Sequence, residues 1–330
     1  MKQFTAGKNE EGVRLSRFVQ SVTAQLPTSL LYKSFRNKRI KVNGKRGEPD
    51  TRLAAGDIIE LYINDEFFPA AGAVGTKAAV GETGAAKPPR PHKARTPLRV
   101  LFEDANIAVL YKPAHLLCHS DRTGDESLVE LFTQYLAARG EYDAAQENTF
   151  SPAICNRLDR GTEGLVLAAK NYAALRDMNE LIRTDLVQKQ YLCITVGAPP
   201  TGVHTAYLAH SEKNNKVTVC AAPREGFREI ITGVEVLQRK GPFALCRVDL
   251  RTGRTHQIRA HLAFLGAPVL GDVKYGNRKM NERTGAKTQA LCAVSLGFAE
   301  NIPAQNTLAY LAGRTVALEH PAVEAQFAAL

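Results

Sequence analysis

Apolar and polar residues near the start of the chain alternate first at helical and then at strand spacing. Two short helices on either side of Pro27 are predicted by apolar residues three or four positions apart, which are Leu15, Phe18, Val19, Val22 and Leu26, then Leu30, Leu31 and Phe35. The segment 39–44 predicts a strand that ends in the turn pair Asn43-Gly44, and residues 56–63 predict another strand. The pattern indicates a compact module of helices followed by strands.

Strand and helix patterns are mixed in the rest of the chain. Residues 100–102 and 107–111 predict two short strands, which the turn-forming segment 103–106 joins. A helix is predicted over 127–138, and the continuous apolar run 165–169 is typical of a buried strand. These signals describe a scaffold and carry no chemistry by themselves.

The clearest change in composition lies at residues 69–97, which consist mainly of Ala, Gly, Pro and Lys. Such a segment cannot bury enough apolar surface to order itself, so it is predicted to be a flexible linker. The predicted domains are therefore residues 1–68 and residues 98–330.

The chain of 330 residues carries a formal net charge of +10, with 44% hydrophobic and 23% charged residues. These fractions are ordinary for a soluble globular protein and exclude a wholly disordered, collagen-like or coiled-coil chain. The positive charge favours a polyanionic partner, either nucleic acid or an anionic membrane surface. No apolar stretch approaches the ~20 residues of a membrane-spanning helix, and the six cysteines form no C-x-x-C pair. We therefore expect a soluble cytoplasmic protein that uses its charge to bind nucleic acid.

A candidate catalytic carboxylate precedes the predicted buried strand. Asp159 lies between Arg157 and Arg160 in a loop that leads into the strand, and Gly161 and Gly164 frame a tight turn directly before the strand. Two neighbouring guanidinium groups should keep a carboxylate ionised, which suits a nucleophile better than a proton donor. The same spacing also fits a surface patch of salt bridges.

The segment 251–276 concentrates basic residues at the start of a predicted helix. Thr255 is the predicted N-cap, a stripe of apolar residues follows, and Gly266 is predicted to end the helix. Arg254, His256, Arg259 and His261 cluster on its first turns. The two histidines are five positions apart, do not share a helix face, and have no cysteine or carboxylate to complete a metal site. A clamp for phosphate or carboxylate groups explains the cluster better.

Basic residues also gather in the N-terminal module, where positions 13–63 hold ten basic and four acidic residues. The candidate RNA-binding residues among them are Lys33, Arg36, Lys38, Arg39, Lys41, Lys45 and Arg46. Such an excess suits RNA phosphates, although a solvated basic face on a small domain has the same composition.

The module resembles the alpha-L ("S-four") RNA-binding domain. The resemblance covers it almost from end to end, through an Arg-Leu opening, a Leu-Pro junction between helices, a Val-Asn-Gly turn and a closing Leu-x-x-Gly-Asp. It implies that residues 1–68 bind RNA. Leu30 and Tyr32 stand where the family often has small polar residues.

The larger part of the chain resembles the RluA-type pseudouridine synthases, and most closely those of the large ribosomal subunit. NRLDRGTEGLVLAAKN (156–171) is similar to the family's catalytic motif, KQYLCITVG (189–197) to its Lys-x-Tyr motif, and residues 251–276 to its third motif. LCAVSLGF (291–298) is similar to its closing strand. The resemblance implies an α+β fold, with a mixed, largely antiparallel central sheet and flanking helices and loops.

The resemblance also implies a role for individual residues. Asp159 would be the nucleophile, attacking the anomeric carbon or the base ring, or acting first as a base at the ribose. Tyr191 would stack on the uracil and accept the proton from its ring carbon, and Arg259 would hold Asp159 ionised. Substrate binding is implied for Arg157, which would fill the space of the extruded nucleotide, and for Leu291, Arg254 and His256. Asn156, Glu163 and Cys292 depart from the family pattern.

The expected activity is the isomerisation of specific uridines to pseudouridine, without cofactor or metal. The expected partner is RNA, most simply large-subunit ribosomal RNA or its precursor, with no membrane or DNA, and the expected state is a monomer. Transfer RNA is the alternative substrate. A second alternative is a non-catalytic RNA-binding or ribosome-assembly factor that keeps the fold without the chemistry.

Overall fold

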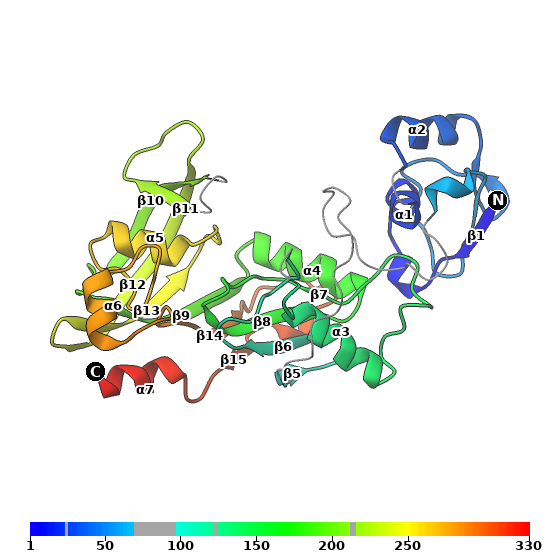
Figure 1. The fold of residues 1–330 in the computed structure, drawn as a ribbon. Helices are drawn as coiled ribbons and strands as arrows, with labels where there is room; N and C mark the ends of the chain where they lie inside the picture. Colours follow the sequence, from blue (N-terminus) through cyan, green and yellow to red (C-terminus); the bar gives the residue numbers. More distant parts are fainter. Residues whose placement is uncertain (24–25, 69–96, 122–123, 212–215) are drawn as a thin grey trace. The chain divides into compact units, whose positions relative to one another are not determined.

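The computed structural model describes residues 1–23, 26–68, 97–121, 124–211 and 216–330. The chain divides into two compact units (Figure 1). The first unit comprises 1–97, 132–152 and 171–173, and the second comprises 98–131, 153–170 and 174–330. The predicted linker 69–97 lies outside the described residues apart from Pro97.

The first unit contains a four-stranded antiparallel sheet. Its strands follow the order β1 (Lys2–Thr5), β4 (Ile58–Leu61), β2 (Ile40–Val42) and β3 (Lys45–Arg46). The predicted turn at Asn43-Gly44 joins β2 to β3, and both of its residues have positive φ, 51° and 76°. Such values are those of a tight two-residue hairpin turn. The sequence pattern missed β1, because a strand of four residues at a sheet edge carries little periodicity.

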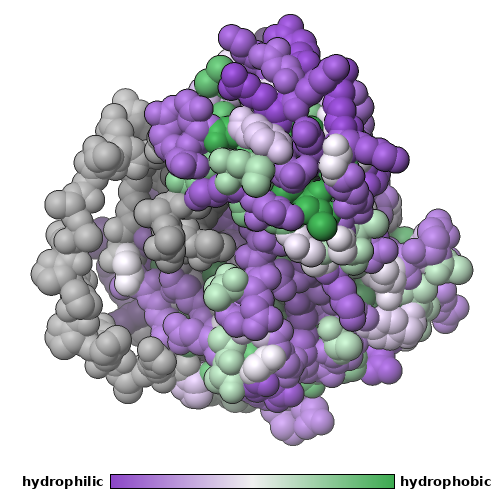
Figure 2. All heavy atoms as spheres, turned by 90° about the vertical axis from the view of Figure 1, so that its right-hand side faces the viewer, coloured by the Kyte–Doolittle hydropathy of each residue, from purple (hydrophilic) through white to green (hydrophobic). Residues whose placement is uncertain are grey.

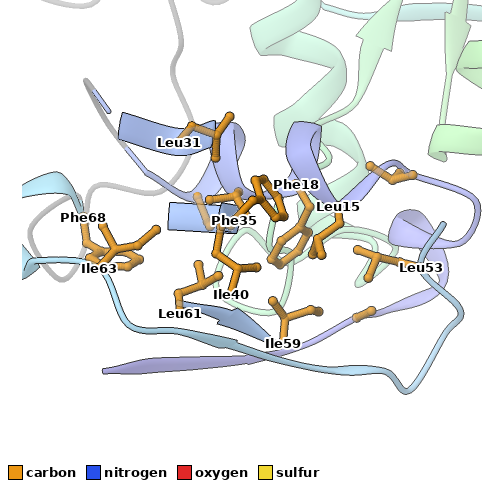
Figure 3. Close-up of a cluster of buried hydrophobic side chains, with 14 residues drawn as sticks. Leu15, Phe18, Leu31, Phe35, Ile40, Leu53, Ile59, Leu61, Ile63 and Phe68 are labelled. Carbon is orange, nitrogen blue, oxygen red and sulfur yellow. The ribbon is translucent and has the colours of Figure 1, made fainter. Parts of the chain in front are cut away.

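Two helices cover this sheet with apolar side chains. The helices are α1 (Leu15–Val22) and α2 (Thr28–Arg36). Phe18, Leu31 and Phe35 from the helices meet Ile40, Ile59 and Leu61 from the strands in one buried cluster (Figure 3). Burial of a large apolar side chain stabilises a fold by about 1.5 to 3 kcal/mol, so this cluster accounts for the order of so small a unit.

Polar contacts tie the N-terminal segment to the later segments of the same unit. Glu10 is buried and accepts hydrogen bonds from Gly7 N at 2.8 Å and from Thr149 Oγ1 at 2.6 Å. Asn9 donates to Glu147 Oε1 at 2.7 Å and accepts from Tyr172 N at 3.0 Å. Residues 5–10 are therefore packed against chain from positions near 148 and 172.

The second unit is built on an eleven-stranded sheet. Its main path runs β11 (Lys216–Cys220), β10 (Gly202–Ser211), β12 (Arg228–Lys240), β13 (Phe243–Leu250), β9 (Val187–Val196), β14 (Leu291–Phe298), β8 (Glu163–Ala169), β6 (Ile107–Lys112) and β5 (Arg99–Glu103). Two short strands lie off this path, β7 (Ala153–Ile154) beside β8 and β15 (Thr315–Ala317) beside β14. All pairs are antiparallel except β8 with β14. A largely antiparallel sheet within an α+β fold is thereby confirmed.

Helices accompany the sheet at several points along the chain. They are α3 (Leu128–Ala138), α4 (Tyr172–Arg183), α5 (Gln257–Phe264), α6 (Arg278–Thr284) and α7 (Ala322–Ala329). Buried residues of α4 pack with β6, β8 and β14, whereas those of α7 pack with β9, β13 and β14. Among the described residues, no helix combines the length and apolar character that crossing a bilayer demands.

Most of the elements predicted beyond residue 97 are confirmed. The strands at 100–102 and 107–111, the buried run 165–169 and the helix over 127–138 correspond to β5, β6, β8 and α3. The predicted N-cap of α5 was wrong by one residue. His256 and not Thr255 occupies that position, and its φ of 55° lies in the left-handed region. In the first unit, α1 ends at Val22, so Leu26 lies beyond the helix to which its spacing assigned it.

Candidate active site

Asp159 lies in the loop between β7 and β8, and a close strand contact fixes the end of that loop. Thr162 N donates to Asp159 O at 3.0 Å, which closes a turn. Gly164 follows with a φ of 120°, and a Cβ there would come within 2.2 Å of Ala293 O on β14. Only glycine allows β8 to run this close beside β14. The turn and the contact together hold the Asp159 side chain in one place at the strand end.

Arg259 on α5 binds Asp159 and is itself fixed by Asp272. Its Nη1 donates to Asp159 Oδ2 at 2.7 Å. Its Nε and Nη2 donate to the two oxygens of Asp272 at 2.6 and 2.9 Å. Asp272 is only 1% exposed and also accepts from Lys274 N and Tyr275 N. A bidentate pair of this geometry fixes the guanidinium plane and aims the remaining nitrogen at Asp159.

The charges of this cluster stabilise one another. Burial alone would raise the pKa of Asp272, but hydrogen bonds and charge pairing with Arg259 outweigh it and lower that pKa. Burial alone would lower the pKa of Arg259, yet its bonds to Asp272 and Asp159 raise it. Both groups are therefore charged at neutral pH, and Asp159 faces a permanent cation.

His256 lies beside the same carboxylate. Its Nε2 is 4.0 Å from Asp159 Oδ2, and its Nδ1 is 3.0 Å from the hydroxyl of Tyr275. Burial lowers the pKa of His256, and the Asp159 charge counters this only in part. A neutral imidazole can donate or accept a hydrogen bond without adding a charge to the site.

Tyr191 and Leu291 come from two adjacent strands of the sheet centre. Tyr191 on β9 pairs with Val248 of β13 and Ala293 of β14, and Leu291 begins β14. The tyrosine is 5% exposed. Burial, followed by the nearby charge of Asp159, raises the pKa of Tyr191, so its phenol stays protonated and uncharged.

These side chains line one pocket with a volume of about 400 Å³. All seven predicted catalytic and substrate-binding residues line it, namely Asp159, Tyr191, Arg259, Arg157, Leu291, Arg254 and His256. Its other charged wall residues are Lys189 and Arg251, so the wall holds five cationic side chains and one carboxylate. The size suits a single nucleotide, and the charge suits a polyanion.

One expectation about Asp159 is wrong. Its sequence neighbour Arg160 points elsewhere and donates to Asp125 Oδ2 at 2.7 Å. Arg157 is exposed and lines the pocket. The guanidinium that binds the carboxylate is Arg259, one hundred positions along the chain.

Two of the three departures from the family pattern have structural partners. Asn156 Oδ1 accepts from Leu167 N at 2.7 Å, which joins the Asp159 loop to β8. Glu163 accepts from the hydroxyl of Tyr111 at 2.8 Å. Cys292 on β14 is buried in an apolar cluster, and the structure gives no reason for a cysteine there.

Sequence reasoning missed three residues of this site. Asp272 holds Arg259, and Gln257 links Thr252 and Arg254 N to β12 through four hydrogen bonds. Lys189 lines the pocket two positions before Tyr191. Each of the three residues lies inside a sequence motif that was already identified. Only its contacts with residues distant in the sequence distinguish it from the other residues of that motif. In the described part of the chain, no group of three or more His, Cys, Asp or Glu side chains could hold a metal ion.

The seven predicted RNA-binding residues lie on α2, on β2 and β3, and on the turn between α2 and β2. All are exposed except Lys41, which is half-buried with its Nζ 5.1 Å from the centre of the Tyr62 ring. Arg46 pairs with Glu48 at 3.1 Å. The face of the molecule in Figure 2 is predominantly hydrophilic, with small separate hydrophobic areas.

Comparisons with known proteins show similarity to RNA pseudouridine synthases. A family model described as RNA pseudouridylate synthase matches residues 106–264. The ribosomal large subunit pseudouridine synthase C of Salmonella typhimurium is 29% identical over 302 residues, which cover 88% of this chain and 86% of that protein. An uncharacterized RNA pseudouridine synthase of Mycoplasma capricolum is 27% identical over 294 residues, covering 86% of this chain and 88% of that one. The structure of human RNA pseudouridylate synthase domain containing 4 matches with a TM-score of 0.52 and 23% identity, covering 67% of this chain and 88% of that one, and shares the fold.

Proposed function

We propose that the chain is a member of the RNA pseudouridine synthase family and isomerises specific uridines of large-subunit ribosomal RNA, with Asp159 as the nucleophile and no cofactor. One observation carries the proposal. Arg259, held by the buried Asp272, donates to Asp159 in a pocket that also contains Tyr191. An ionised carboxylate, oriented by a fixed cation beside an aromatic ring, suits attack on a nucleoside.

The chemistry needs only these side chains. In the isomerisation the bond from N1 of uracil to the anomeric carbon breaks, and a bond from C5 to that carbon forms. N1 gains a proton and C5 loses one, so composition and oxidation state stay unchanged. The Asp159 carboxylate starts the reaction at the anomeric carbon, at the base ring or as a base at the ribose. Arg259 offsets the change of charge on Asp159 in each case.

Tyr191 has a stacking role in this proposal. Its ring lies in the pocket wall, where a uracil can stack on it while it detaches, turns and reattaches. The raised pKa of Tyr191 disfavours a standing phenolate. Its hydroxyl therefore acts late, when it relays the C5 proton to a stronger acceptor in the site.

The exposed residues around the pocket are proposed to hold the RNA. Arg157 is placed to fill the stack that the extruded uridine leaves, because it is exposed and lies two positions before Asp159. Extrusion costs a few kcal/mol and least in an unpaired loop. The N-terminal unit, with its exposed cations on α2 and the following turn, is proposed to bind other phosphates of the RNA as an alpha-L RNA-binding domain.

Ribosomal RNA is the proposed substrate because the Salmonella typhimurium relative carries that activity in its name. The test uses the purified full chain and unmodified transcripts of bacterial large-subunit ribosomal RNA, in buffer without nucleotide or redox cofactor. Carbodiimide mapping should find pseudouridine at one or a few positions. Modification of transfer RNA transcripts alone would overturn the ribosomal assignment, and modification of neither RNA would overturn the proposed function.

A further inference from the structure

Lys189 is a buried cation in the wall of the active-site pocket. It lies on β9 two positions before Tyr191, so both side chains leave the same face of the strand. Lys189 is only 9% exposed and lines the same pocket as Asp159 and Arg259. Its cross-strand neighbour on β14 is Leu296, which belongs to a buried apolar cluster.

The ammonium group of Lys189 uses little of its hydrogen-bonding capacity. An ammonium has three donors, and within the described residues Lys189 makes one hydrogen bond, to Val187 O at 3.1 Å. It forms no salt bridge within 4.0 Å among the same residues, although the charge of Asp185 acts on it from further away. The only carboxylate in the pocket wall, Asp159, already accepts from Arg259. A buried charge with so few partners is costly unless a ligand completes its shell.

We propose that Lys189 binds a backbone phosphate of the RNA next to the extruded uridine. This inference rests on the proposed function. A phosphodiester is the anion that an extruded nucleotide necessarily brings into the pocket, since the phosphates flank its sugar. A full negative charge compensates a buried ammonium better than a neutral uracil carbonyl does. The interaction persists from the bound uridine to the bound pseudouridine, so it contributes to binding and not to the chemical step.

Burial lowers the pKa of Lys189, and the Asp185 charge only partly opposes this. A bound phosphate would restore the charged form, so RNA binding and protonation of Lys189 support each other. Replacement by methionine, which has a similar shape and no charge, removes the buried ammonium. A residue kept for the stability of the fold would lose stability on this change, whereas a phosphate ligand should lose none.

The experiment compares the parent with Lys189→Met, Lys189→Arg and Lys240→Met on the unmodified large-subunit ribosomal RNA transcript. Lys240 is the matched control, because its Nζ also donates to one backbone carbonyl, Ala328 O at 2.7 Å, but it is exposed and outside the pocket. Filter binding over a salt series gives the slope of affinity against salt. Initial rates give kcat and KM, and a thermal unfolding curve gives the midpoint temperature of unfolding.

Lys189→Met should raise KM roughly tenfold, since a hydrogen bond to a charged group is removed, with kcat within about twofold of the parent. Its salt slope should be shallower by about 0.7 to 0.9, because the protein then neutralises one phosphate fewer. Its unfolding midpoint should be unchanged or higher. Lys189→Arg should retain the parental slope, and Lys240→Met should match the parent in every respect.

A Lys189→Met variant that matches Lys240→Met in KM and slope would overturn the inference. So would an increase in KM with an unchanged slope, which would indicate binding to an uncharged group such as a uracil carbonyl. A lower unfolding midpoint for both Lys189→Met and Lys189→Arg would identify a structural lysine instead. Absence of pseudouridine in the parent reaction would instead contradict the proposed function.

Discussion

Arg259 donates a 2.7 Å hydrogen bond to Asp159 across one hundred positions of sequence. The bond joins the loop before β8 to the first turn of α5. Its geometry depends on the buried Asp272, which binds the Nε and Nη2 edge of the guanidinium. Arg259 thus positions the proposed nucleophile Asp159, and the ion pair with Asp272 positions Arg259.

Asp272→Asn should destabilise the fold and slow the reaction. The change leaves the Arg259 guanidinium, which is 5% exposed, without its bidentate carboxylate. Loss of one partner of a buried pair costs about 3 to 5 kcal/mol of unfolding free energy. A displaced Arg259 should also reduce kcat by about tenfold to a hundredfold, because small misplacements at a reacting centre cost that much. Urea unfolding and initial rates measure the two effects.

Asp125→Asn is the control for that variant. Asp125 also pairs with an arginine, Arg160, at 2.7 Å, but both side chains are about half exposed. The cost of this change should stay below about 1 kcal/mol, with unchanged kcat. Equal effects of the two substitutions would contradict the assigned role of Asp272.

Tyr191→Phe should separate stacking from proton relay. The ring and its burial remain, so RNA affinity and the unfolding midpoint should match the parent. Loss of the hydroxyl should lower kcat by about a hundredfold or more, the usual size of a general acid–base contribution. Single-turnover kinetics measure this directly. A variant with parental kcat would leave Tyr191 with stacking alone.

The buried His261 should make the protein less stable in mild acid. Burial lowers the pKa of His261 to about 4, and its Nδ1 is 3.0 Å from Thr232 Oγ1. The unfolded chain therefore takes up a proton near pH 6.5 that the folded chain accepts only near pH 4. The contribution of neutral His261 to the free energy of unfolding is therefore complete above pH 6.5. It decreases as the pH falls from 6.5 to about 4, by at most about 1.4 kcal/mol per pH unit.

Urea unfolding from pH 7 to pH 4 tests this dependence. His261→Asn, whose amide oxygen can still accept from Thr232, should show a shallower fall in unfolding free energy over that range. His320→Asn changes an exposed histidine and should follow the parent. Parallel curves for the parent and His261→Asn would show that another group causes the fall.

The exposed cations of the N-terminal unit should determine much of the salt dependence of RNA binding. We expect a quadruple change to glutamine to weaken binding to the ribosomal transcript and to flatten its salt slope by up to about 3, at about 0.7 to 0.9 for each phosphate that is no longer neutralised. The residues changed are Lys33, Arg36, Lys38 and Arg39. Filter binding at several salt concentrations measures the slope.

A second quadruple variant controls for net charge. It replaces four exposed cations of the other unit, which are Arg183, Lys279, Arg283 and Lys287. Both variants lose the same charge, so an effect of net charge alone would flatten both slopes equally. Equal slopes would contradict an RNA-binding role for the N-terminal unit.

The sequence predicted the strands and helices with strong periodicity, and motif resemblance predicted which residues would share a pocket. Adjacency along the chain misled for Arg160, because the turn after Asp159 directs the next side chain to Asp125. Asp272 was missed because its role depends on a contact with α5, and no local pattern records such a contact. The one-residue error at the start of α5 has a similar cause. The left-handed backbone at His256, with its ring against Tyr275, is set by tertiary packing.

The central claim, that Asp159 catalyses isomerisation of uridine in ribosomal RNA, is tested most directly in cells. Pseudouridine is mapped by carbodiimide in large-subunit ribosomal RNA from cells with the gene, without it, and without it but supplied with either the parent or Asp159→Asn. We predict that one or a few sites are lost on deletion, restored by the parent and not restored by Asp159→Asn, whose RNA affinity stays within a few-fold of the parent. Restoration of those sites by Asp159→Asn would contradict the claim.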